Sequence, residues 1–210
     1  MSSPVTTEPP YVPIRRTRWA TRRTPLWALA VLALLAVGAV LVALSQTPSQ
    51  AQRASDLRGF LGDMKYDIES CAGGVSESMT ALRQVESGAS HDVTTAIYIA
   101  NTGAANCSPA NNSQLDDLDN YQVTESLSSF RLGRVVSGLV AWAAPDAENV
   151  QSDVALVLQH LGNPQAKAAD TAALQRALRI LDAQRASVNA IMNSAIRSLS
   201  AHASPPNLPG

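Results

Sequence analysis

The chain has 210 residues, of which 46% are hydrophobic, 16% are charged and only 4% are aromatic. This length and composition are typical of one folded domain with appendages and argue against wholesale disorder. The formal net charge of −1 is unevenly distributed, because residues 1–25 hold five arginines against one acid, whereas the rest holds 11 basic and 16 acidic residues. Since the larger part is net acidic, we expect no nucleic-acid binding.

Residues 26–44 form an apolar run of 19 residues without a charge. A helix needs about 20 such residues to cross the hydrocarbon core of a membrane, so we predict an integral membrane protein with a single transmembrane helix. Five arginines stand immediately before this run, and the positive-inside rule therefore places the N-terminus in the cytoplasm and residues 45–210 outside it. These arginines are Arg15, Arg16, Arg18, Arg22 and Arg23.

A cleaved signal peptide is the alternative to a retained anchor. Small residues at positions 43–45 and 49–51 would suit a signal peptidase. The apolar run is longer than the ~7–15 residues of a usual signal-peptide core, which favours a retained signal anchor. In either case we expect the remainder of the chain to lie in an extracytoplasmic compartment.

Proline-rich and polar stretches predict the boundaries of the folded part. We expect residues 1–25 to be a disordered cytoplasmic tail, residues 45–55 a polar stalk and residues 201–210 a second disordered tail. The intervening residues 56–200 are predicted to be one α-helical domain, because their apolar residues recur at helical spacing and no strand-like alternation is present.

Four helical arms are expected in this domain, with a short turn or helix between the second and third. The arms are predicted at residues 56–87, 91–108, 125–161 and 170–200. Ser90 and Asp170 are the expected N-caps of the second and fourth arms, and Pro145 should divide the third. Long arms joined by short connections predict an up-and-down bundle resembling a four-helix bundle.

Cys71 and Cys107 are predicted to form a disulfide. Each lies in phase with the apolar stripe of its helix, and each is 18 residues from Ala89, so that an antiparallel hairpin centred on Ala89 places them at the same height. The extracytoplasmic location and the even number of cysteines also favour this bond. Two buried free thiols are the alternative.

Gly74 and Gly103 are predicted to allow a close approach of the first two helices. A disulfide needs Cα atoms within about 4.4–6.8 Å of each other, whereas helix axes normally pack ~8–10 Å apart. Both glycines lie near the cysteines and almost level across the hairpin. We therefore expect leucine at Gly74 to hinder the disulfide more than leucine at Ser78 does, unless the glycines only kink the first helix.

Arg185 interrupts the apolar stripe of the last arm. The expected outcome is that its guanidinium reaches water along the flexible stem. Otherwise the side chain is buried and pairs with Asp63 or Asp67 of the first arm, which would create a polar ligand pocket inside the bundle. The sequence leaves open whether a small molecule binds.

The sequence contains no recognisable pattern for catalysis or for a cofactor. The three histidines are far apart and form neither HxxxH nor HExxH, and the acidic run at residues 116–119 lacks the glycine and the distal glutamate of a calcium loop. GxSxG, phosphate-binding glycine loops and CxxC are also absent. We therefore expect no cofactor, no metal site and no enzymatic activity.

The function favoured by these features is a non-catalytic interaction module of the cell envelope, which contacts a protein partner or a second copy of itself. The alternatives are a secreted helical protein and a ligand-sensing bundle that acts through a partner. Such a bundle would be similar in architecture alone to the four-helix extracytoplasmic domains of bacterial chemoreceptors. The overall design also resembles short anchored proteins of actinobacteria, which implies a bacterial origin.

Overall fold

The computed structural model describes residue 31, residues 33–37 and residues 48–209. The chain divides into two units, Met1–Thr47 and Pro48–Gly210, and the described residues of the first unit are helical. Most of the predicted membrane span and all five arginines before it lie outside the described residues. Among the residues that are described, no helix is both long and apolar enough to cross a membrane.

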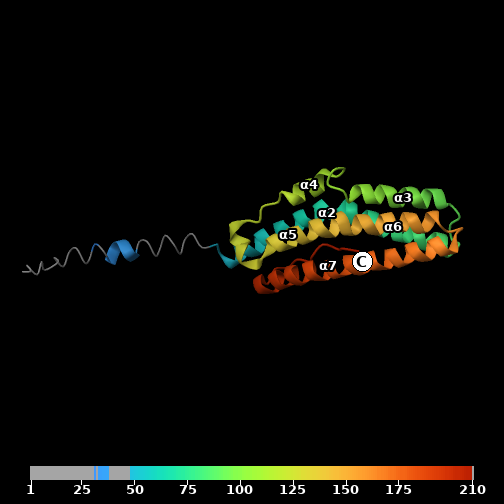
Figure 1. Cartoon of the computed structure of the whole chain (residues 1–210). Helices are drawn as coiled ribbons and strands as arrows, with labels where there is room; N and C mark the ends of the chain where they lie inside the picture. Colours follow the sequence, from blue (N-terminus) through green and yellow to red (C-terminus); the bar gives the residue numbers. More distant parts are fainter. Residues whose placement is uncertain (1–30, 32, 38–47, 210) are drawn as a thin grey trace, which may run out of the picture. The chain divides into compact units, whose positions relative to one another are not determined.

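The second unit is a helical bundle, and its described residues include no strand. Helix α2 runs the length of the bundle, α3 returns beside it, α5 and α6 form the third arm, and α7 returns along that arm (Figure 1). The bounds are α2 Gln50–Glu86, α3 Val93–Asn106, α4 Ser113–Asp119, η1 Glu125–Phe130, α5 Leu132–Ala141, η2 Trp142–Ala147, α6 Glu148–Gln159 and α7 Pro164–Leu199. The predicted all-α bundle is thus confirmed.

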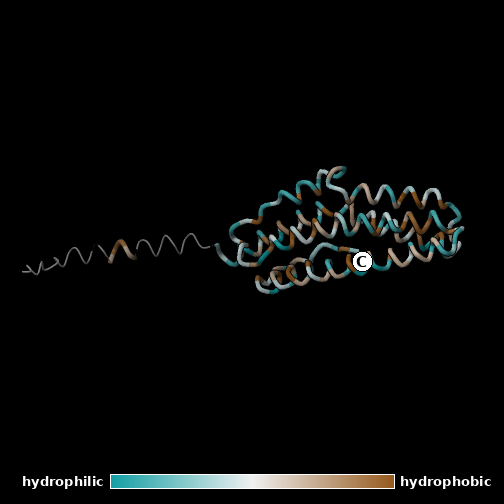
Figure 2. Tube along the Cα trace, in the orientation of Figure 1, coloured by the Kyte–Doolittle hydropathy of each residue, from teal (hydrophilic) through white to brown (hydrophobic). Residues whose placement is uncertain are grey.

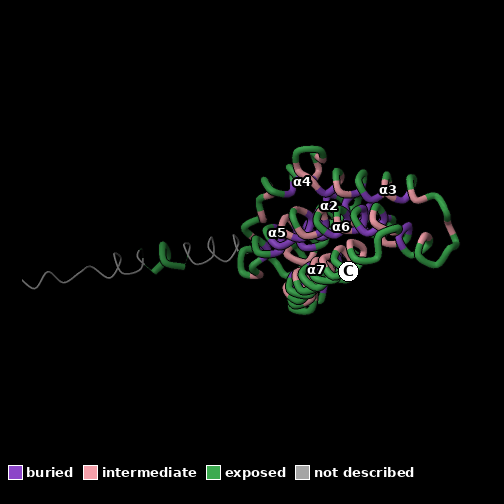
Figure 3. The backbone as a smooth tube through the Cα atoms, turned by 45° about the vertical axis from the view of Figure 1, so that its right-hand side comes forward, coloured by how far each residue is buried: buried purple, intermediate pink, exposed green. Residues whose placement is uncertain are grey.

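A continuous apolar core follows the inner faces of the arms (Figure 3). Hydrophobic and hydrophilic residues alternate along each helix at the spacing of amphipathic helices (Figure 2). The core residues of α2 are Leu57, Phe60, Leu61, Met64, Ile68, Cys71, Val75, Ala81 and Leu82. Burial of each large aliphatic side chain contributes about 1.5–3 kcal/mol, so this stripe is the main attachment of α2 to the bundle.

Helix α2 begins earlier than the sequence predicts. Its N-cap is Ser49, whose hydroxyl accepts a hydrogen bond from the backbone N–H of Gln52 at 3.1 Å. Residues 50–55, predicted as part of a polar stalk, are therefore helical, and α2 begins before the predicted start of the domain at residue 56. The physical reason is that a serine cap followed by good helix formers starts a helix even where no apolar stripe is present.

The caps of α3 and α7 also differ from the prediction. Asp92, rather than Ser90, caps α3 through the backbone N–H of Thr95 at 2.9 Å. Asn163, rather than Asp170, caps α7 through the N–H of Ala166 at 3.2 Å. Pro164 then occupies the first turn of α7, where its missing N–H needs no partner. The last arm is consequently longer than expected.

The third arm bends where a break is predicted. Ala144 has φ −130° and ψ 115°, which is extended backbone inside an otherwise helical segment, and Pro145 follows it. Proline disfavours helical geometry in the residue before it, which accounts for the break. Trp142 and Ala147 on either side are fully buried, so the bend lies within the core.

The C-terminal segment 201–209 is not the disordered tail that its proline content suggests. After α7 ends at Leu199, this non-helical segment packs against the bundle, and the side chain of Leu208 is only 3% exposed. The guanidinium of Arg185 lies 3.4 Å from the carbonyl oxygen of Leu208. Burial of one leucine and this polar contact hold the segment in place, and the prediction of disorder was wrong.

Candidate functional site

The bundle is cross-linked between its first two helices. Cys71 of α2 and Cys107, at the end of α3, form a disulfide with Cα atoms 4.6 Å apart, and both residues are fully buried. The predicted pairing is confirmed. In the chain-entropy treatment, a closed loop of 36 residues stabilises the fold by about 4 kcal/mol.

Two glycines let the backbones meet beside this disulfide. A Cβ added to Gly74 would lie 2.9 Å from the Cα of Gly103, and a Cβ added to Gly103 would overlap the side-chain oxygen of Gln151. A Cβ on the adjacent Gly73 would meet nothing within 4 Å. Gly74 and Gly103 therefore occupy positions where a side chain is excluded by contact, whereas Gly73 does not.

A buried polar group lies between the glycines and the disulfide. Gln151 of α6 is fully buried, and its Nε2 donates a hydrogen bond to the Sγ of Cys107 at 2.9 Å. Its Oε1 lies 3.2 Å from the hydroxyl of Ser78, which donates to the carbonyl oxygen of Gly74 at 2.7 Å. Because Ser78 is itself fully buried, leucine there is not the neutral comparison that we expected from the sequence.

Gln151 was missed by the sequence analysis. It is spaced three and seven residues from Val154 and Leu158, which places it on the buried stripe of α6. This helical spacing is the feature of the sequence from which the burial of Gln151 could have been predicted. The amide joins α6 to the α2–α3 pair and fixes the position of the cross-link relative to the third arm.

The small residues leave a groove on the outer side of the α2–α3 pair. Its volume is about 420 Å³. The lining comprises Glu69, Ser70, Gly73, Gly74 and Glu77 from α2 and Tyr98, Ile99, Thr102, Gly103 and Asn106 from α3. Two carboxylates and no basic side chain line it, and Tyr98 on its rim is 69% exposed. The groove therefore combines an aromatic surface with negative charge.

Acidic side chains gather where α4 packs on α2. Asp63 and Asp67 are one helical turn apart on α2, and the hydroxyl of Tyr121 donates to Asp63 at 2.9 Å. Desolvation, together with the nearby charges of Asp63 and Asp117, raises the pKa of Asp67 to about 6. Burial and the bond to Asp63 raise the pKa of Tyr121 to about 12. A carboxylate that is costly to ionise thus lies where α4 packs on α2.

Arg185 and the two aspartates are not brought together. The Arg185 guanidinium pairs with Asp182 of its own helix at 2.6 Å and is partly exposed, so the side chain escapes from the core. Asp67, in contrast, is only 8% exposed, and no hydrogen bond or ion pair to it occurs within the part of the chain that the structure describes. The buried Arg185 pair considered from the sequence was therefore the wrong alternative.

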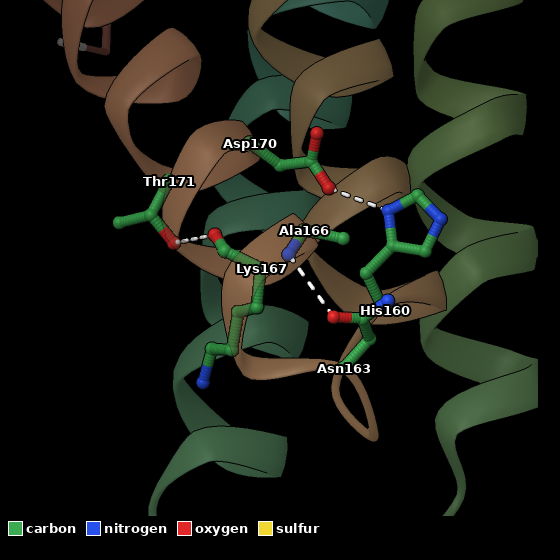
Figure 4. Close-up of polar contacts among 6 residues, drawn as sticks. All are labelled: His160, Asn163, Ala166, Lys167, Asp170 and Thr171. Carbon is green, nitrogen blue, oxygen red and sulfur yellow. Dashed lines mark hydrogen bonds and ion pairs between the residues drawn. The ribbon is translucent and has the colours of Figure 1, made fainter.

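Polar contacts close the end of the bundle at the α6–α7 turn (Figure 4). His160, which ends α6, lies with its Nδ1 2.6 Å from the Oδ2 of Asp170 on α7. Lys167 pairs with Glu86 at 3.0 Å and joins α7 to the end of α2. Such exposed pairs contribute only about 0–1 kcal/mol each, and we assign them to the architecture of this turn.

A second groove lies next to the first on α2, sharing Glu69 and Gly73 with it, and is bordered by the C-terminal segment. It measures about 400 Å³ and is lined by Lys65 and Glu69, by small residues of α2 and by Pro206, Asn207 and Pro209. Its charges are of both signs, so it offers less electrostatic selectivity than the α2–α3 groove. In the described residues, no three histidine, cysteine or acidic side chains are grouped so that they could hold a metal ion.

Comparison with known proteins gives no relative, since no family model, no curated protein and no solved structure matches this chain. The function is therefore argued from the chemistry of the surface described above.

Proposed function

We propose that this protein is a membrane-anchored interaction module whose bundle is displayed outside the cytoplasm, where it binds a protein partner. Residues 26–44 would be the anchor, with the arginine-rich N-terminus in the cytoplasm. The bundle would act without a catalytic step and without a cofactor, as a rigid body that presents its surface to the partner.

The observation that carries the proposal is the buried Cys71–Cys107 disulfide. Structural disulfides form and persist in oxidising compartments and are rare in the cytosol. The uncharged run that follows the arginine cluster supports the same location from an independent feature of the sequence. A cross-link that restrains α2 and α3 also keeps the groove between them in one shape. A groove of fixed shape favours binding, because the protein loses little conformational entropy on association.

The exposed apolar side chains of the bundle support a protein partner. Four large ones are exposed among its described residues: Tyr66, Tyr98, Leu156 and Ile180. Tyrosine is enriched at protein interfaces, because its ring buries a large area and its hydroxyl keeps a polar contact. Two of the four are tyrosines, on the two helices that the disulfide joins.

In-cell photo-cross-linking tests this proposal. A photoreactive phenylalanine analogue is placed separately at each of these four positions in the full-length chain, and adducts are identified by mass spectrometry after irradiation of intact cells. We expect at least one position to capture a specific second protein that is absent without irradiation. The absence of any adduct at all four positions would contradict the proposal.

A further inference from the structure

We infer that the C-terminal segment, residues 204–209, also binds to a second copy of this chain, so that two copies associate by exchanging their C-terminal segments. The segment binds on α2 and α7, at a place that we call the segment site, formed by Ile68, Ala72 and Gly73 of α2 and Arg185 of α7. The inference goes beyond the proposed function, because it names a second copy as a partner and holds on either side of the membrane.

The segment is bound to the bundle in the manner of an extended peptide. Pro206 and Leu208 are buried, whereas Asn207 between them is exposed. This alternation is that of an extended chain with one face toward its binding site. The segment turns back along α7 (Figure 1), and Leu208 joins the apolar core. The observed occupant of the site is therefore a short extended stretch anchored by one large apolar side chain.

Few hydrogen bonds hold the segment. Among the residues that the structure describes, the contact of the Arg185 guanidinium with the carbonyl oxygen of Leu208 is the one hydrogen bond made by residues 204–209. Prolines at positions 205, 206 and 209 have no N–H to donate, and their rings fix the backbone in an extended form. Because the free segment already favours this form, it loses little conformational entropy when it binds. The segment can thus leave and rebind as a unit.

The segment covers α2 without filling the space above it. A groove of about 400 Å³ remains between α2 and the residues Pro206, Asn207 and Pro209. Its α2 side includes Gly73, where an added Cβ would meet nothing within 4 Å. Detachment of the segment therefore breaks few contacts apart from those of the buried Leu208.

A second copy is the occupant that the site fits, because the sequence observed in it is this chain's own. Helix α7 ends at Leu199, and residues 202–205, which are exposed or half-buried, connect it to the buried Pro206. These four residues span at most about 14 Å. Exchange therefore requires that the C-terminal ends of two α7 helices lie side by side about a two-fold axis. Exchange of an identical element is a low-cost route to dimers, since every contact already exists within one chain.

Competition with a free peptide tests the segment site. The full-length chain in detergent is titrated into a fluorescein-labelled peptide of residues 204–210. Leu208→Asp should bind the peptide at least about tenfold more tightly than the unmodified chain, because a carboxylate resists burial and the variant's own segment no longer competes. The control Asn207→Asp adds the same charge at the exposed neighbouring position and should change the affinity less than about twofold.

Photo-cross-linking between two forms of the full-length chain tests the exchange. One form carries a photoreactive phenylalanine analogue at position 207, and the other carries only an affinity tag. We expect irradiation to join position 207 to residues 65–76 of the tagged copy, in a fraction that rises with protein concentration and falls at least about fivefold when Leu208→Asp is added to the photoreactive form. The analogue at position 168, exposed near the start of α7, is the control and should not join to these residues.

Each experiment has an outcome that overturns the inference. Equal affinity of Leu208→Asp and the unmodified chain for the peptide would show that the segment does not occupy a separable site. Adducts of position 207 confined to its own chain at every concentration would show that copies do not exchange segments, and this measurement keeps Leu208 in place. Neither result changes the expected capture of a different protein in cells, so failure here is distinguishable from failure of the proposed function.

Discussion

Gly103 and Gly73 show how differently two glycines in one region are constrained. A methyl group on Gly103 would overlap the fully buried Gln151, whereas one on Gly73 would enter open space. The contrast follows from their positions, since Gly103 faces the α6 arm and Gly73 is exposed. The two sites therefore form a matched pair for testing the close approach of α2 and α3.

We predict that Gly103→Ala lowers the free energy of unfolding by about 1–3 kcal/mol, the usual cost of forcing extra volume into a packed site. Gly73→Ala should leave it unchanged or raise it by up to about 1 kcal/mol, because alanine is the better helix former. Denaturant titration of the full-length variants, followed by circular dichroism, measures both. Equal effects of the two substitutions would mean that the helices do not meet closely at Gly103.

Asp67 makes stability depend on pH in a direction opposite to that of a salt-bridged carboxylate. Its pKa of about 6 lies above the ordinary value of 3.8, so the folded chain holds the proton more tightly than the unfolded chain. Stability is therefore expected to fall as pH rises from about 4 to about 6, and the penalty is fully present above that range.

Asp67→Asn should remove this penalty and raise the free energy of unfolding near neutral pH by about 1–3 kcal/mol. Its advantage over the unmodified protein should disappear below about pH 3, where Asp67 is protonated in both states. Unfolding measured across this pH range checks the result. The variant Asp182→Asn, at a half-exposed position on α7, is the control and should give no such pH-dependent gain. A loss of stability in Asp67→Asn at neutral pH would contradict the account.

At the scale of helices, the disulfide joins the long helix α2 to the shorter helix α3. Helix α3 places few large apolar side chains in the core. The buried residues of α3 are Ala96, Ala100 and Gly103, which remove little apolar surface from water. The covalent link therefore adds to the attachment that α3 gains from its packing on α2 and α6.

We predict that the double substitution Cys71→Ala and Cys107→Ala lowers the free energy of unfolding by about 4 kcal/mol. Hydrogen exchange should rise first in α3, which the disulfide joins directly to α2, and less in α7, which has its own large apolar contacts. Mass spectrometry of exchanged peptides measures this order. A uniform rise along all arms would show that α3 is held by packing alone.

Helical periodicity explains why the arms and the disulfide were predictable. The stripe on α2 and the equal spacing of Cys71 and Cys107 about Ala89 are local patterns, so helix phase and one turn suffice to derive the pairing. The start of α2 was missed because Gln50 and its neighbours lack an apolar stripe, although Ser49 is a suitable cap. The cap of α7 was misplaced for a related reason, since Asn163 and Pro164 were interpreted only as the end of the preceding arm.

The clustering of Asp63, Asp67 and Asp117 and the packed C-terminal segment were harder to derive. Asp67 and Asp117 approach each other only because α4 folds back on α2, and no periodicity specifies that path. Leu208 is a single leucine in a proline-rich stretch, which has no repeat from which burial could be inferred. Contacts set by tertiary packing override local composition in both cases.

At the scale of the whole molecule, the account depends on the side of the membrane on which the bundle lies. The disulfide, the apolar run at residues 26–44 and the arginines before it all favour the outer side. The exposed surface of the bundle would then meet partners outside the cytoplasm, where the oxidised form of the cross-link persists. Each of these expectations fails if the bundle lies in the cytoplasm.

Labelling of intact cells with a membrane-impermeant maleimide tests this location most directly. One variant carries Ser152→Cys, at an exposed position on α6, and the other carries Thr6→Cys, near the N-terminus. The account predicts that the cysteine at 152 is labelled in intact cells and that the cysteine at 6 is labelled only after lysis. Labelling of the cysteine at 152 only after lysis would contradict the proposed display of the bundle outside the cytoplasm.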